Sequence, residues 1–183
     1  MIPFPNKKYQ IIYADPPWSY RDKASAGNRG AIYKYDVLDN NYLCNLPIEN
    51  ISEDNCALFL WVTMPMLQEG LNLMKAWGFT YKTVGFIWVK RNKKAATWFW
   101  GMGNYTRSNP ELCLLAFKGK LKRQSASIHS IIESPIEEHS KKPAIVRDKI
   151  VELFGDLPRI ELFARQTTPG WDVWGNEVEV TAA

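Results

Sequence analysis

The string Asp15-Pro16-Pro17-Trp18 carries the residue types needed to hold an aromatic amine. Each proline fixes its own φ angle and lacks a backbone N–H, so we expect the Pro16 carbonyl to be a rigid acceptor beside the Asp15 carboxylate. Two adjacent acceptors match an exocyclic –NH₂ group, which has two N–H donors. Trp18 adds a flat face on which a base could stack. The string therefore predicts a site for a flipped base whose amine attacks a reactive carbon. The alternative is a strand-ending turn with a solvated Asp15.

Aromatic and basic residues elsewhere in the chain favour nucleic acid as the partner. The net charge is only +4, which by itself does not establish nucleic-acid binding, but basic residues cluster at 91–94 and 118–123. Aromatic residues make up 13% of the chain, and several lie in polar sequence. We expect stacking on bases and phosphate contact along one edge of a sheet. The candidate substrate-binding residues are Trp18, Tyr20, Trp98, Trp100, Tyr105, Arg107, Lys93 and Lys94. The alternatives are solvated turns for the basic clusters and a local packing knot for Trp98-Phe99-Trp100.

The elements that must position these residues alternate between apolar strands and amphipathic helices. Strands are expected at 9–14, 56–62, 81–89, 112–117, 159–163 and 171–174. Helices are expected to begin at Pro65 and Pro143 and to end at Gly78 and Gly155. Long loops are expected at 19–45 and 91–109, and residues 124–140 are expected to be polar and mobile. Strands that are apolar throughout predict an α/β fold with a mostly parallel sheet and helices on both faces. Ligands bind beyond the carboxyl ends of such strands.

Length and composition indicate one globular domain over residues 1–183. No apolar run approaches the length of a membrane span, and the N-terminal residues do not resemble a signal peptide, so we expect a cytoplasmic protein with no membrane partner. The three cysteines show no C-x-x-C spacing, which argues against disulfides and fits a reducing compartment. His129 and His139 lack metal-ligand spacing, so we expect no metal site.

Several segments, in this order and spacing, resemble one known family. They are Ala14–Trp18, LFLWVT at 58–63, NPELCLLAFKG at 109–119, HSKKP at 139–143, RIELFAR at 159–165 and PGWDVWGNE at 169–177. The chain is similar to the family named for the seventy-kilodalton subunit of the messenger-RNA adenosine methyltransferase, and most of all to its bacterial and phage members. It departs from the family at Pro110, where a lysine is usual. We also expect no counterpart to the cofactor-contacting segment that precedes the motif in eukaryotic members.

The resemblance implies a Rossmann-like methyltransferase that uses S-adenosylmethionine, with a permuted order in which the catalytic motif precedes the cofactor strand. It implies that Asp15 and Pro16, with Pro17 and Trp18 in the same motif, hold the adenine amine. Arg165 would approach the cofactor's ribose hydroxyls or carboxylate, and the 140–142 stretch its methionine end, where a helix N-terminus also favours a carboxylate. The cofactor-binding residues that it implies are Asp15, Ser140, Lys142, Glu161, Arg165, Gln166, Asn176 and Glu177.

The sequence thus predicts a methyltransferase that modifies the N6 amine of adenine in nucleic acid. DNA is favoured over RNA, because the chain looks like the bacterial and phage members. One alternative is methylation of another amine, although cytosine enzymes of this type usually resemble S-P-P-Y instead of the string at Asp15. The other is a non-catalytic nucleic-acid-binding subunit of a methyltransferase complex. Because the domain is small, a homodimer or a heterodimer with a related subunit is also considered, with residues 124–140 as a candidate interface.

Overall fold

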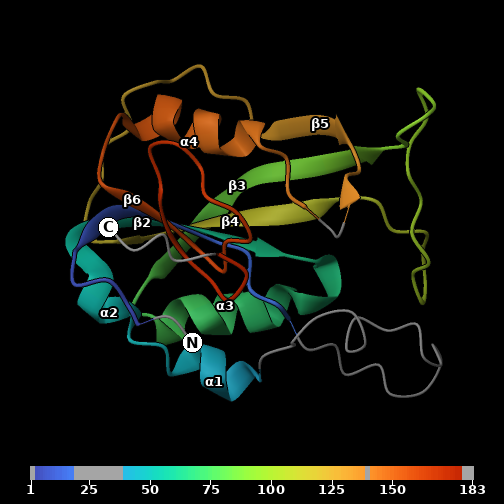
Figure 1. The fold of residues 1–183 in the computed structure, drawn as a ribbon. Coiled ribbons are helices and arrows are strands. Elements are labelled where there is room, and N and C mark those ends of the chain that lie inside the picture. Colours follow the sequence, from blue (N-terminus) through green and yellow to red (C-terminus); the bar gives the residue numbers. More distant parts are fainter. Residues whose placement is uncertain (1–2, 19–38, 139–140, 179–183) are drawn as a thin grey trace.

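Seven strands form one central sheet in the computed structural model, in which residues 3–18, 39–138 and 141–178 are described. The strand order across the sheet is β5-β3-β4-β2-β1-β6-β7 (Figure 1). The strands are β1 (Tyr9–Ala14), β2 (Ser52–Val62), β3 (Thr80–Arg91), β4 (Glu111–Lys118), β5 (Ile131–Pro135), β6 (Arg159–Leu162) and β7 (Asp172–Trp174). β1 and β2 lie near the middle, and their residues 11–14 and 56–62 are apolar and buried, as expected for strands that helices cover on both faces.

The sheet is mixed, since β4 runs antiparallel to both of its neighbours while the other four pairings are parallel. The carboxyl ends of β1, β2, β3 and β6 therefore meet at one edge, and β4 begins there. The prediction that both basic clusters lie along one edge is wrong. Lys118, at the end of β4, pairs with Cys56 near the start of β2, so the 118–123 cluster follows β4 at the opposite edge. Glu111, at the start of β4, lies at the carboxyl edge instead.

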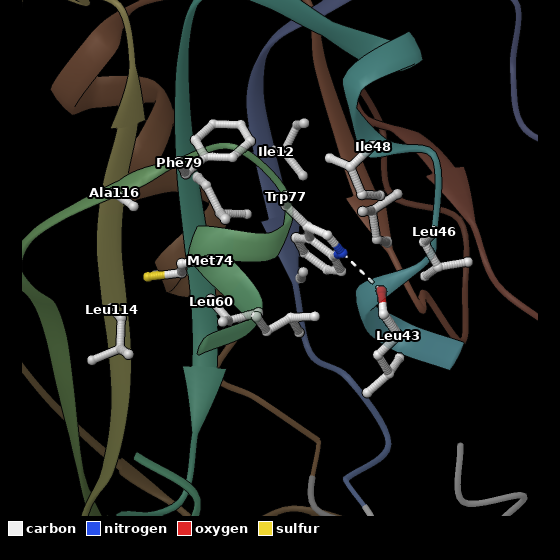
Figure 2. Close-up of a cluster of buried hydrophobic side chains, with 14 of the residues drawn as sticks. Ile12, Leu43, Leu46, Ile48, Leu60, Met74, Trp77, Phe79, Leu114 and Ala116 are labelled. Atoms are coloured by element: carbon white, nitrogen blue, oxygen red, sulfur yellow. Dashed lines mark hydrogen bonds between the residues drawn. The ribbon is translucent and has the colours of Figure 1, made fainter. Parts of the chain in front are cut away.

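Helices cover both faces of the sheet, as the sequence predicts (Figure 1). α1 (Asn40–Cys44), α2 (Ile48–Ile51) and α3 (Leu67–Ala76), with the 3₁₀ turn η3 (Met64–Met66) before α3, pack on one face. α4 (Ile145–Phe154) packs on the other and ends at Gly155, whose φ of 94° suits a glycine. Each face holds its own cluster of buried apolar side chains. In the first cluster, shown in Figure 2, the indole nitrogen of Trp77 donates a 2.8 Å hydrogen bond to the Leu43 carbonyl and so ties α3 to α1.

Two parts of the sequence prediction need correction. Residues 124–140 are not uniformly irregular, because β5 lies within them and pairs with β3. Its signal in the sequence is weak, since Ile132 is its one fully buried residue and the strand lies at the sheet edge. The predicted loop at 19–45 contains α1 at its end, and the part of it at 19–38 lies outside the described residues. Within the described residues, no helix is both long and apolar enough to span a membrane.

Candidate active site

A cavity of about 720 Å³ opens beyond the carboxyl ends of β1 and β6. Its wall combines residues of these two strands, of α4 and of the loop before α4. The lining residues are Tyr13, Asp15, Lys93, Glu137, Glu138, Lys141, Lys142, Arg147, Glu161, Phe163, Arg165, Gln166 and Glu177. The volume lies in the range typical of small-molecule and cofactor sites. The place in the fold is where open α/β sheets bind their ligands.

Four alternating charges run from the end of β3 to the cavity; we call Lys90, Glu111, Lys142 and Asp15 the charge chain. The Lys90 ammonium lies 2.6 Å from one Glu111 oxygen, and the Lys142 ammonium lies 3.1 Å from the other. Lys142 also donates a 2.9 Å hydrogen bond to Oδ2 of Asp15. The lysine side chain is buried, whereas Asp15 keeps 29% of its side chain exposed. The charge chain thus presents one carboxylate to the cavity, that of Asp15, which Lys142 anchors.

Burial and ion pairing shift the pKa values of the charge-chain residues in opposite directions. Burial raises the pKa of Asp15, and the Lys142 charge offsets only part of that rise. Burial alone would lower the pKa of Lys142, but Asp15 and Glu111 more than compensate, so its pKa is raised and it stays protonated at neutral pH. Burial would raise the pKa of Glu111, yet Lys142 and Lys90 hold that pKa below its usual value. Of the two carboxylates in the charge chain, Asp15 is therefore the one whose pKa is raised, and Glu111 the one whose pKa is lowered.

The turn that follows β1 differs from its prediction in one respect. Trp18 is only 7% exposed, and its indole nitrogen donates a 3.0 Å hydrogen bond to the Trp61 carbonyl of β2. The turn folds Trp18 back into the core on the α3 side, so Trp18 is buried here, and its role in stacking on a base stays a prediction. The Pro16 carbonyl accepts the backbone N–H of Trp18 at 2.9 Å. A carbonyl oxygen has two lone pairs, so this bond fixes the orientation of Pro16 and leaves one acceptor site.

A buried ion pair forms the inner wall of the cavity. Arg147 of α4 donates two hydrogen bonds of 2.6 Å, one to each carboxylate oxygen of Glu161 in β6. The guanidinium also lies 5.6 Å from the ring centre of Tyr13, whose hydroxyl accepts a 2.6 Å hydrogen bond from Trp61. Beyond β6, Phe163 has a φ of 60°, a strained value for a bulky residue, and it lies in the cavity wall.

Most of the predicted cofactor-binding residues meet at this cavity. Those in its wall are Asp15, Lys142, Glu161, Arg165, Gln166 and Glu177. Asn176 is exposed and is not part of the wall, and Ser140 lies outside the described residues. The sequence analysis missed Tyr13, Arg147, Glu137 and Glu138. A charged residue beside Val146 in the apolar stripe of α4 is the signal that could have identified Arg147. No group of three potential metal ligands is found among the described residues.

The substrate candidates between β3 and β4 lie on a ribbon that projects from the sheet (Figure 1); we call residues 92–108 the aromatic ribbon. A backbone hydrogen bond from the Gly101 N–H to the Ser108 carbonyl, 2.7 Å long, joins its outgoing and returning parts. The guanidinium carbon of Arg91 lies 4.6 Å from the ring centre of Trp98, and Trp100 is 59% exposed. The other exposed candidates on the ribbon are Lys93, Lys94, Tyr105 and Arg107, of which Lys93 also reaches the cavity. Tyr20 lies outside the described residues.

The chain is similar to known proteins along almost its whole length. A family model described as MT-A70 matches residues 9–177. The Type II methyltransferase M.MunI of Mycoplasma sp is 38% identical over 192 residues, which cover 95% of this chain and 79% of that enzyme. The human N(6)-adenosine-methyltransferase catalytic subunit METTL3 is 27% identical over 94% of this chain and 28% of its own length. The human N(6)-adenine-specific methyltransferase METTL4 is 28% identical over 94% of this chain and 38% of its own length.

Proposed function

The chain belongs to the MT-A70 family, and from this premise we propose that it transfers a methyl group from S-adenosylmethionine to the N6 amine of adenine in DNA. The observation that carries the proposal is Asp15, a carboxylate anchored by Lys142 at the edge of a cavity of cofactor size. Membership in an adenine methyltransferase family agrees with the resemblance that the sequence indicates. We also propose the permuted order, with the catalytic turn after β1 preceding the cofactor strand β6.

The cavity has the chemistry that S-adenosylmethionine requires. Arg165, Gln166 and Glu177 offer donors and acceptors for ribose hydroxyls and adenine, and Phe163 offers an aromatic surface. The ammonium of Lys142 is placed to meet a carboxylate. Glu161 has both oxygens bonded to Arg147, so we assign it to the wall and not to direct binding of the ribose. The sulfonium of the bound cofactor supplies an electrophilic methyl group.

The residues of the catalytic turn would hold the adenine amine. Its nitrogen is a poor nucleophile, because its lone pair is delocalised into the ring. Asp15 would accept one N–H, and the remaining lone pair of the Pro16 carbonyl would accept the other, which localises the nitrogen lone pair. Most of the acceleration would come from this positioning. Because burial raises its pKa, Asp15 is also suited to accept the proton that the methylated amine releases.

The aromatic ribbon is the proposed contact for the nucleic acid. Its exposed Trp100 and Tyr105 can stack on unpaired bases, and Lys94 and Arg107 can approach phosphates. We favour DNA because the alignment extends along 79% of the bacterial Type II enzyme, against 28% of METTL3. Dimerisation and a cytoplasmic location stay predictions from the sequence.

A methyl-transfer assay with matched variants tests the proposal. Purified protein is incubated with labelled S-adenosylmethionine and with DNA or RNA oligonucleotides of the same sequence, with and without adenine, and the nucleosides are identified by mass spectrometry. We expect N6-methyladenine in the adenine-containing DNA. Asp15→Asn should lose turnover but keep cofactor binding in calorimetry, whereas Asp54→Asn, an exposed change at the opposite sheet edge, should behave as the wild type. Transfer to RNA alone would overturn the choice of DNA. Cofactor binding without transfer to any nucleic acid would overturn the assigned substrate, and loss of both would favour a non-catalytic subunit.

A further inference from the structure

Lys90 lies where the aromatic ribbon joins the charge chain. It is the penultimate residue of β3, and 16% of its side chain is exposed. Its ammonium contacts Glu111 at 2.6 Å and lies 5.1 Å from the ring centre of Trp88 and 6.0 Å from that of Phe99. This ammonium therefore touches the base of the ribbon on one side and the buried carboxylate of β4 on the other.

The backbone of Lys90 is held as firmly as its side chain. The Asn109 side chain accepts the N–H of Lys90 at 2.8 Å and donates to its carbonyl at 2.9 Å. The same Asn109 amide donates to the carbonyl of Phe99 on the ribbon. Asn109 thus clamps the end of β3 to the ribbon and fixes the backbone from which the Lys90 side chain reaches Glu111.

The charges around Asp15 explain what this ammonium does. The groups that face Asp15 are the cations Lys142, Arg165 and Arg147, the anion Glu111 and the thiol of Cys113. Lys142 is shared between Asp15 and Glu111. With Lys90 present, Glu111 has a second cation, so the charge chain is neutral. Without Lys90, two carboxylates would compete for Lys142, and an uncompensated negative charge would remain in a buried region.

We propose that Lys90 is a positioning residue for methyl transfer, which neutralises Glu111 and thereby keeps Lys142 on the catalytic carboxylate of Asp15. This inference rests on the proposed role of Asp15. It assigns to the ribbon a second task, because Asn109, which clamps Lys90, also holds Phe99 at the base of the surface proposed to bind nucleic acid. The acceptor for the adenine amine and the support of the ribbon are then one connected unit.

The test separates the charge of Lys90 from its contribution to folding. Lys90→Met removes the charge, Lys90→Gln keeps a hydrogen-bond donor without charge, and Lys90→Arg keeps both. Lys82→Met, an exposed change on the same strand, is the matched control. The Asp15 carboxyl is titrated by ¹³C NMR in each protein, with Asp15→Asn for assignment. Rates of methyl transfer are measured against pH, together with KM for S-adenosylmethionine.

We expect Lys90→Met and Lys90→Gln to move the Asp15 titration and the acid limb of kcat upward by about one pH unit, because a compensating cation is lost. The KM for the cofactor should change less than kcat, Lys90→Arg should restore the profile, and Lys82→Met should leave it unchanged. An unmoved Asp15 titration in folded Lys90→Gln would overturn the proposal, even if its melting temperature fell. If the wild type transfers no methyl group, the proposed function fails, and the NMR titration alone decides the role of Lys90.

Discussion

The buried ion pair in the cavity wall should respond very differently to losing one partner and to losing both. The side chains of Arg147 and Glu161 are 9% and 8% exposed, and two hydrogen bonds join them. Arg147→Met would leave the Glu161 carboxylate buried and unpaired, which costs about 3–5 kcal/mol of unfolding free energy. A domain of this size loses about 2–4 °C of melting temperature per kcal/mol, so the fall should be roughly 6–20 °C.

Replacing both residues removes the unpaired charge. The double variant Arg147→Met/Glu161→Leu should recover most of the lost stability, because a packed apolar pair often replaces a buried ion pair without net cost. Thermal melts of both single variants, the double variant and the exposed control Arg123→Met, all without cofactor, give the coupling free energy between the two side chains. An Arg147→Met protein that melts within about 2 °C of the wild type would refute the reasoning, since it would mean that Glu161 is solvated through the cavity.

Three further changes probe other parts of the molecule. Trp18→Phe should cost about 1–3 kcal/mol in chemical denaturation, because the Trp61 carbonyl loses its donor; an increased KM for the oligonucleotide would instead indicate base stacking. Hydrogen bonds from Lys7 and Tyr9 outweigh burial and lower the pKa of Asp172. Asp172→Asn should therefore lower the melting temperature at pH 7, and the difference from the wild type should shrink below about pH 4; a constant difference would contradict this. Gly119→Ala should destabilise by about 1–3 kcal/mol with unchanged activity, since φ is 63° and a Cβ would lie 2.2 Å from a carbonyl oxygen.

The sequence predicts those elements whose signal is local. β1 has the predicted bounds because its residues are apolar on both faces and the Asp15-Pro16-Pro17 string stops it. β5 escapes prediction because little of it is buried. An apolar run does not reveal the direction in which a strand runs, so the antiparallel β4 could not be recognised. Because of that one reversal, the prediction placed the 118–123 cluster at the wrong edge of the sheet.

In the candidate site too, residues within local motifs could be predicted, whereas contacts that depend on tertiary packing could not. Asp15 and Lys142 belong to recognisable segments, and the structure brings their side chains together. Arg147 carries no motif, and only the packing of α4 against β6 reveals its partner. Trp18 is the opposite case. Its residue type suggests a surface for stacking on a base, but the backbone after Pro17 directs its side chain into the core. Side-chain direction after a turn depends on tertiary packing, which a residue pattern does not encode.

The position of β1 also sets when the protein can become active during its synthesis. β1 pairs with β2 on one side and with β6 on the other, and Asp15 is separated from Lys142 by 127 positions in the chain. Ribosomes add about 5–20 residues per second, so roughly 6–25 s pass between the emergence of the two residues. Throughout that interval the nascent polypeptide carries Asp15 without Lys142 or the residues of the cavity wall that follow it. Asp15 therefore cannot form its contact with Lys142 until the ribosome has reached the last third of the chain.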